Sequence, residues 1–208
     1  MACEFDHIAI TAETRESGCS EFQATTGIEL PLGGEHPLMG THNCVTSLGD
    51  DTFLELITID PDAPKPPHKR WFALDDVKPN GLIAHAVVLR SDDLDGDLVK
   101  AKSLSVDLGA PLALTRGDMT WRFAVRDDGA IPLDGAAPML MQWDNPVPHP
   151  ASKMQDQGIR LNGIKVVSPH ATKLSELYDA LGWSELDIEE GDTRLSFTLS
   201  ISGTQVTL

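Results

Sequence analysis

Three stretches of the chain begin alike and lie at equal intervals. They are residues 5–10 (FDHIAI), 83–88 (IAHAVV) and 161–166 (LNGIKV). Aligning them puts His7, His85 and Gly163 at successive spacings of 78 residues (85 − 7 and 163 − 85). A fixed period with strand-like openings predicts one supersecondary unit used three times. This repetition limits the fold more strongly than any local propensity does.

Each repeat predicts a strand, a helix and three further strands. Opening strands are expected at 5–11 and 83–90, and helices at 13–26, at 92–108 and after Ser168-Pro169, ended by Gly27, Gly109 and Gly182. The later strands are expected at 28–32, 41–48, 52–59, 111–115, 120–126, 138–143, 184–189, 193–201 and 204–208. The sequence therefore predicts an α+β fold of repeated βαβββ modules.

Proline-rich segments mark the boundaries between the modules. We expect module 1 at residues 1–75, module 2 at 80–145 and module 3, the shortest, at 159–208. Segments 60–67 and 145–158 are rich in proline, which lacks the N–H group that a helix interior needs. Each boundary is therefore predicted to be a stiff, extended crossing.

Charge and cysteine content exclude several classes of protein. The 32 acidic and 16 basic residues give a formal charge of −16, which repels nucleic acids and anionic membrane surfaces. The 3 cysteines lack the spacing of a disulfide framework or a zinc finger, and no apolar run is long enough to span a bilayer. We therefore expect a soluble cytoplasmic protein whose partner is a small molecule, not a nucleic acid or a membrane.

A few polar side chains stand out on the predicted strands. Strand alternation places Phe5, His7 and Ala9 on one face, with Asp6 on the opposite face toward the helix. Glu55 lies among apolar residues in FLELI, where a carboxylate is costly unless it is paired or binds metal. Its counterpart in the last strand of the second unit, MLMQW, is Gln142.

Several short motifs carry a resemblance to a known family. They are DHI at 6–8, HP at 36–37, GTHN at 40–43, FLEL at 53–56 and RWF at 70–72, with QW at 142–143 and HP at 149–150. With the paired βαβββ units, these motifs resemble the glyoxalase-like domain branch of the vicinal oxygen chelate superfamily, which includes glyoxalase I, extradiol dioxygenases and bleomycin-resistance proteins. The third unit resembles only the module topology.

The resemblance implies a fold and a metal site. Two modules are expected to form an open mixed-sheet barrel whose cavity holds a divalent metal, and the matching ligand positions are His7, Glu55, His85 and Gln142. Two imidazoles, a carboxylate and an amide oxygen suit Fe, Mn, Co, Ni or Zn better than Ca or Mg. Gln142 departs from the carboxylate ligand of glyoxalase I, because an amide cannot accept the substrate's proton.

Two histidines are candidates for the missing base. His42 shares a face with Glu55 if paired residue numbers across the hairpin add to an odd sum, and one residue of slip reverses this. His149 lies in a proline-stiffened segment and is a candidate to close over the cavity. With Glu55, these are the predicted catalytic residues.

Other residues are assigned to the rim, the surface or the core. Arg70 and Trp71 are expected to form part of the rim of the cavity. The remaining histidines are interpreted as surface residues and two tryptophans as core packing: His36, His68, His170, Trp121 and Trp183.

The leading functional hypothesis is a glyoxalase-like, metal-dependent enzyme. Its metal is expected to chelate vicinal oxygens of a small organic molecule and to stabilise an enolate or related oxyanion. Isomerase, lyase and dioxygenase chemistry stay open, because His7, His85 and Glu55 also match the two-histidine, one-carboxylate pattern of non-haem iron oxygenases. The alternative is a metal-free protein that binds or sequesters a small molecule in the same cavity.

The third unit predicts an assembly. It has Gly163 where the other units have histidine, so its role is expected to be structural. An odd module leaves a free sheet edge and an apolar face that need covering. We therefore expect a homodimer in which this unit packs on a second copy.

Overall fold

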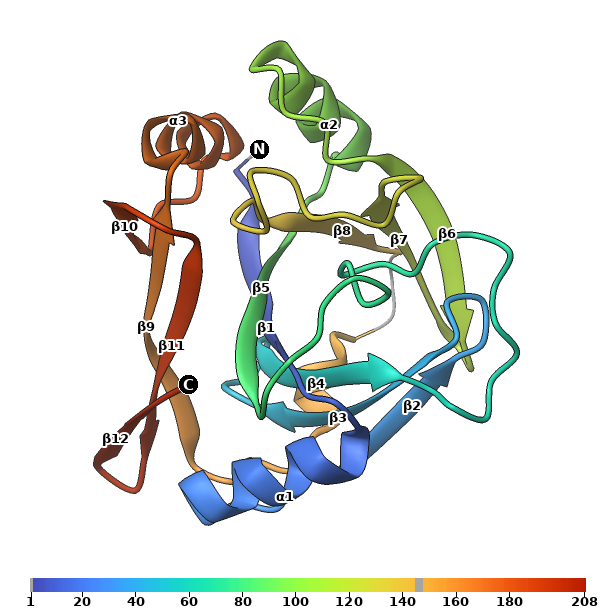
Figure 1. Cartoon of the computed structure of the whole chain (residues 1–208), viewed down its shortest axis with the longest axis vertical. Coiled ribbons are helices and arrows are strands. Elements are labelled where there is room, and N and C mark those ends of the chain that lie inside the picture. Colours follow the sequence, from blue (N-terminus) through green and yellow to red (C-terminus); the bar gives the residue numbers. More distant parts are fainter. Residues whose placement is uncertain (1, 145–147) are drawn as a thin grey trace.

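The structure is a computed structural model that describes residues 2–144 and 148–208. It confirms the α+β fold class, because three successive sets of strand, helix and three strands follow one another along the chain (Figure 1). Residues 145–147 of the second predicted linker lie outside the described residues. Within the described ranges, no helix combines the length and apolar character needed to cross a bilayer.

The first unit follows the prediction except at its second strand. Its elements are β1 (Glu4–Thr11), α1 (Arg15–Thr26), β2 (Leu32–His36), β3 (Thr41–Ser47) and β4 (Phe53–Ile59). A capping box between Thr14 and Ser17 starts α1, and Gly27 ends it in the left-handed conformation. The strand expected at 28–32 is wrong. Pro31 has no N–H to donate, and pairing with β3 begins only at Leu32.

The second unit has a shorter helix than predicted. Its elements are β5 (Ile83–Arg90), α2 (Leu94–Ser103), β6 (Ala110–Arg116), β7 (Met119–Val125) and β8 (Met139–Trp143). Leu104 caps α2, and Ser105 follows with φ 61°, so the helix does not reach Gly109. Gly109 has φ 99° and lies so close to the Val125 backbone that a side chain has no room there. It is needed for strand packing, not for helix capping.

Eight strands form one strongly curved sheet around an interior. Their order is β2-β3-β4-β1-β5-β8-β7-β6, so β2 and β6 are the two edges. Figure 1 shows the segment between β4 and β5 crossing the space that this sheet encloses. That segment carries Trp71 and Phe72 against Phe123 of β7, and Phe72 has φ 56°. The interior is therefore closed by a long connection as well as by strands.

Two β-bulges interrupt the central β1–β5 ladder. Phe5 pairs with Leu89 and His7 with Val88, which leaves Asp6 as an extra residue on β1. Ala9 pairs with Ala86 and Ile10 with Ala84, which leaves His85 as an extra residue on β5. The predicted alternation of faces at the start of β1 is therefore wrong, since a bulge shifts the side chains that follow it.

The third unit packs on the outside of its own barrel. Its elements are β9 (Ile159–Ser168), α3 (Ala171–Leu181), β10 (Asp187–Glu190), β11 (Arg194–Ile201) and β12 (Thr204–Thr207), which follow the short helix η1 (Pro150–Lys153). In Figure 1 its four-stranded sheet lies beside β5, and β11 contacts β5 while α3 contacts α2. Trp183 stacks on Phe5. The second unit of the same chain thus covers one face of the third unit. The homodimer stays a prediction, but an uncovered apolar face no longer argues for it.

Candidate active site

The first two units, together with the segment around η1, line one cavity. Polar side chains of both units line it, and aromatic rings make up much of its wall. The lining residues are His7, His36, Asn43, Val45, Phe53, Glu55, Trp71, Phe72, Arg116, Trp121, Phe123, Met141, Trp143, Pro150 and Met154. An apolar pocket with a few convergent polar groups is the default candidate for a binding or catalytic site.

His7 and Glu55 form a buried pair that faces this cavity. The His7 Nε2 atom lies 3.4 Å from Glu55 Oε2, and both side chains are almost fully buried. On the other side of the ring, Nδ1 lies 2.6 Å from Asp6 Oδ1. The Asp6 carboxylate therefore fixes the orientation of the imidazole and leaves Nε2 toward the cavity. Nε2 itself has no hydrogen-bond partner among the described residues.

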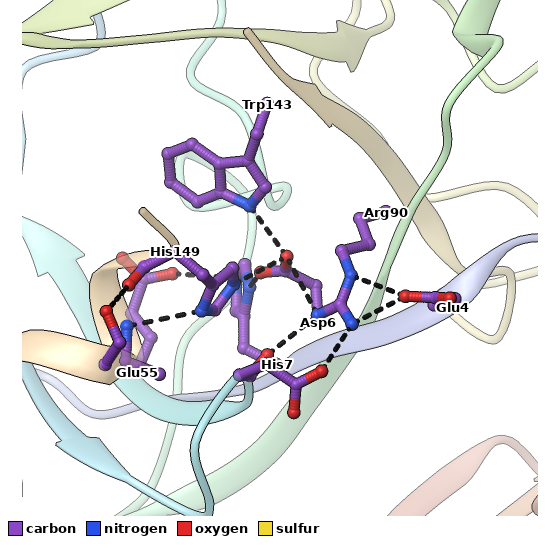
Figure 2. A network of polar contacts seen from close by, with 10 residues as sticks. Glu4, Asp6, His7, Glu55, Arg90, Trp143 and His149 are labelled. Atoms are coloured by element: carbon purple, nitrogen blue, oxygen red, sulfur yellow. Dashed lines mark hydrogen bonds and ion pairs between the residues drawn. The ribbon is translucent and has the colours of Figure 1, made fainter. Parts of the chain in front are cut away.

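Asp6 joins His7 to two further side chains (Figure 2). Its Oδ2 atom accepts a hydrogen bond of 2.8 Å from the Trp143 indole N–H and lies 3.1 Å from His149 Nε2. Arg90 lies 3.9 Å from the same oxygen. The bulge at Asp6 makes this network possible, because the extra residue brings its carboxylate beside the His7 ring. The sequence interpretation, which turned Asp6 toward the helix, missed this residue.

The charges of this network follow from burial and pairing. Burial alone lowers the pKa of His7, but the hydrogen bond with Asp6 and the negative charges of Asp6 and Glu55 outweigh it and raise that pKa to about 9. Burial alone raises the pKa of Glu55, but His7 holds it below its usual value. Likewise, His149 and His7 outweigh burial and hold the pKa of Asp6 well below its usual range. At neutral pH the cavity thus contains an imidazolium next to a carboxylate.

Asn43 holds Glu55 in place, and His42 does not. Val45 pairs with Glu55 across the β3–β4 hairpin, so Asn43 shares the face of Glu55 and His42 points to the other face. Asn43 Nδ2 donates a hydrogen bond of 2.6 Å to Glu55 Oε1, whereas His42 Nδ1 lies 3.7 Å from Asp60. The prediction of His42 as the base is therefore wrong, because the paired residue numbers add to an even sum.

His36 lies in the cavity wall, not on the surface as predicted. It is only 7% exposed, and its ring meets the edge of the Trp71 ring at a centroid distance of 5.1 Å. Burial lowers the pKa of His36 to about 4, so this imidazole is neutral at neutral pH. The error follows from the misplaced second strand, since His36 ends β2 and is not a loop residue.

His85 and Gln142 do not join His7 and Glu55. His85 Nε2 lies 2.6 Å from the Phe72 carbonyl oxygen, which fixes an N–H toward that oxygen. Gln142 Oε1 accepts hydrogen bonds from Leu94 N at the start of α2 and from Arg122. Neither side chain lines the cavity. The four predicted ligands are thus divided between the cavity and the packing around it.

The register explains both corrections. Asp6 and His85 are the two bulge residues, so they occupy corresponding positions in the first and second units. They lie 79 residues apart (85 − 6), the same spacing as the helix N-caps Thr14 and Asp93 (93 − 14). The apparent period of 78 is therefore one residue short here. In β8, Met141 and Trp143 line the cavity, so Gln142 between them faces outward.

The donor set does not fit the metal centre that the resemblance implies. His7 and Glu55 stand together, but the second imidazole and the amide oxygen are engaged elsewhere. Among residues 2–144 and 148–208, no cluster of three or more His, Cys, Asp or Glu side chains has the arrangement of a metal site. The metal ligand set remains a prediction that this geometry does not support.

The other predicted residues have mixed outcomes. Trp71 lines the cavity, whereas Arg70 pairs with Asp75 at 2.6 Å and does not line it. Trp121 is buried in the hydrophobic core, as predicted, and it also lines the cavity beside Trp143. Trp183 is core packing, as predicted, and His68 and His170 lie toward the surface. Asn43 lies in the GTHN motif, where the sequence analysis chose His42 instead, and no sequence signal marked Arg116, since only the sheet register and barrel closure bring these two side chains to the cavity.

Comparisons with known proteins agree with this architecture. The family model described as "Glyoxalase-like domain" matches residues 5–182. A hypothetical protein from Staphylococcus aureus of known structure is 15% identical, with a TM-score of 0.63, over 100% of this chain and 98% of that chain. Methylmalonyl-CoA epimerase from Streptomyces coelicolor, in complex with 2-nitronate-propionyl-CoA, is 17% identical with a TM-score of 0.44, over 72% of this chain and 100% of that chain. No curated protein matches the sequence significantly.

Proposed function

The chain belongs to the glyoxalase-like domain family, and on that premise we propose that it is an enzyme that moves a proton on a small oxygenated organic molecule bound in the cavity. The observation that carries the proposal is the buried His7–Glu55 pair. It provides a base and an acid 3.4 Å apart beside an aromatic-lined space. Enzymes that isomerise or cleave carbonyl compounds need such a pair to form and quench an enolate.

Each group has a definite role in this proposal. Glu55 is ionised, so its Oε2 can take a proton from the carbon next to a carbonyl group, leaving an enolate and a neutral carboxylic acid. The His7 imidazolium can donate its Nε2 proton to the enolate oxygen. Asn43 occupies Glu55 Oε1, and Asp6 holds His7 Nδ1, so each reactive atom is the one facing the cavity. No step of the proposal involves a metal, since His85 and Gln142 are turned away.

His149 acts in this proposal as a positioning residue. Its Nε2 contacts the Asp6 carboxylate and not the cavity, and the backbone N–H of Ala151 donates to its Nδ1. The ring therefore helps to hold Asp6 behind His7. This role differs from the catalytic one expected from the sequence.

Proton exchange in heavy water tests the proposal without knowledge of the natural substrate. We expect the protein to catalyse hydrogen–deuterium exchange at a carbon next to a carbonyl group in a panel of small ketones and 2-oxo acids, followed by proton NMR. Glu55→Gln keeps the size of the side chain but removes the base, and we expect it to slow exchange by about 10²- to 10⁴-fold. Exchange that persists in Glu55→Gln at the wild-type rate would contradict the proposal.

A binding protein without catalysis is the second candidate. The observation that favours it is the wall of aromatic rings, among them Trp121 and Trp143 with centroids 5.5 Å apart. Such a wall suits a planar ligand whether or not chemistry follows. A wild-type protein that binds members of the panel tightly, but exchanges no proton in any of them, would favour this candidate.

A further inference from the structure

We propose that Arg116 is the binding site for a carboxylate group of the substrate, so that the enzyme acts on a small planar organic acid. This inference names the substrate class of the proposed function and uses the same cavity. It depends on one cation that the other described residues leave without a partner, and on the place where that cation lies.

Arg116 closes the barrel at its open edge. It is the last residue of β6, and β6 and β2 are the two edges of the eight-stranded sheet. The guanidinium lies over Gly34 of β2, where an ideal Cβ would be 2.6 Å from Arg116 Nη1. Gly34 therefore leaves the space in which the arginine reaches from one edge to the other. In this position the guanidinium lines the cavity.

The Arg116 guanidinium is not neutralised by any residue in the described ranges 2–144 and 148–208. Its Nη1 atom is buried and has no hydrogen-bond partner among the described residues. Three other arginines behave differently, since Arg70 pairs with Asp75, Arg122 with Asp95 and Arg126 with Asp128. Arginine stays protonated in proteins, so a buried unpaired N–H group is costly unless a ligand supplies an acceptor.

The carboxylates in and behind the cavity are already engaged. Glu55 faces His7 and accepts from Asn43, while Asp6 contacts His7, Trp143 and His149. Within the described part of the chain, no ion pair joins Arg116 to any carboxylate. A carboxylate ligand is the natural complement, because its two oxygens match the fork of guanidinium N–H groups.

The cavity wall determines what is attached to the carboxylate. Phe53, Trp121, Phe123 and Trp143 line the same space. Rings of this kind favour a planar, conjugated or aromatic body over a branched aliphatic one. A planar monocarboxylic acid thus satisfies both the unpaired cation and the aromatic wall.

Calorimetric titration with benzoate and with benzamide tests the inference. The two probes have nearly the same shape, but only benzoate carries the charge. We expect the wild-type protein to bind benzoate about 10- to 100-fold more tightly than benzamide, the range of a hydrogen bond to a charged group. Arg116→Met should remove that preference. The matched control is Arg122→Met in the adjacent strand, which should retain it.

A second variant protects the test against misfolding of Arg116→Met. Gly34→Ala adds one methyl group beside the flexible end of Arg116, so the fold should survive while the guanidinium has to move. We expect it to lower the preference for benzoate as well. Equal binding of the two probes by the wild type, no binding of benzoate, or full preference in a folded Arg116→Met variant would each overturn the inference.

The outcome separates this inference from the proposed function. Glu55→Gln should still prefer benzoate, because the carboxylate site does not need the base. If the preference for benzoate depends on Arg116 but proton exchange does not depend on Glu55, the carboxylate site is supported and the proposed catalysis is refuted. The reverse result would retain the catalysis and refute the carboxylate site.

Discussion

The first and second units have the same order of elements but contribute different chemistry to the cavity. The first unit supplies the titratable pair His7–Glu55 and its supports, Asp6 and Asn43. The second unit supplies Arg116 and part of the aromatic wall. Its own His85 and Gln142 do not face the cavity but form hydrogen bonds with backbone groups around it. Equal topology therefore does not give equal sites, because a shift of one residue in a strand reverses which side chains face inward.

The largest expected difference in proton-exchange rate is between substitutions of Glu55 and of Gln142, its counterpart in the sequence repeat. Glu55→Gln should slow proton exchange by about 10²- to 10⁴-fold, the range for loss of a general base. Gln142→Leu should leave exchange near the wild-type rate, since Gln142 faces away from the cavity and accepts hydrogen bonds from Leu94 and Arg122. The rates are measured by NMR in heavy water on protein checked for folding by circular dichroism. A comparable loss in both variants would break the comparison between the units.

The two histidines of the repeat should give opposite dependence of stability on pH. His7 has its folded pKa raised from 6.5 to about 9, so its contribution is fully present below pH 6.5 and is lost as pH rises through about 9. The loss is expected to be on the order of 1–3 kcal/mol in the free energy of unfolding. Burial lowers the pKa of His85, so its contribution is lost as pH falls below 6.5.

Urea denaturation across this pH range checks that contrast. His7→Gln should flatten the decline between about pH 6.5 and 9. His85→Gln should leave this decline in place and lessen the loss of stability on the acid side. An alkaline decline that is unchanged in His7→Gln would show that another group is responsible for it.

A smaller effect should distinguish two neighbours within the first unit. Asn43→Ala removes a hydrogen bond to the Glu55 carboxylate and should slow proton exchange about 10-fold. His42→Ala alters a side chain on the opposite face of β3 and should keep the wild-type rate. Steady-state exchange rates at saturating probe provide the measurement. A greater loss in His42→Ala than in Asn43→Ala would restore His42 as the proton-transfer group.

Much of the fold was predictable from particular residues. The repeated strand openings gave three βαβββ sets, and Gly27 and Gly182 end their helices in the left-handed conformation as expected. Gly109 failed as a cap because Leu104 and Ser105 end α2 earlier. Only the part of the site that the first unit supplies was predictable. There, His7 and Glu55 stand out as polar residues among apolar neighbours in strands.

The sequence by itself determined the order of elements, the family and the His7–Glu55 pair, because periodicity, turn residues and buried polar residues are local signals. The tertiary structure decided which face each side chain takes. The extra residues Asp6 and His85 in the β1–β5 ladder and the even register of the β3–β4 hairpin left no mark in the polarity pattern. The tertiary structure also decided that the Arg116 side chain packs against Gly34 across the barrel edge. Strand side chains alternate with a period of two, so a single inserted residue changes the site while the pattern of strands stays the same.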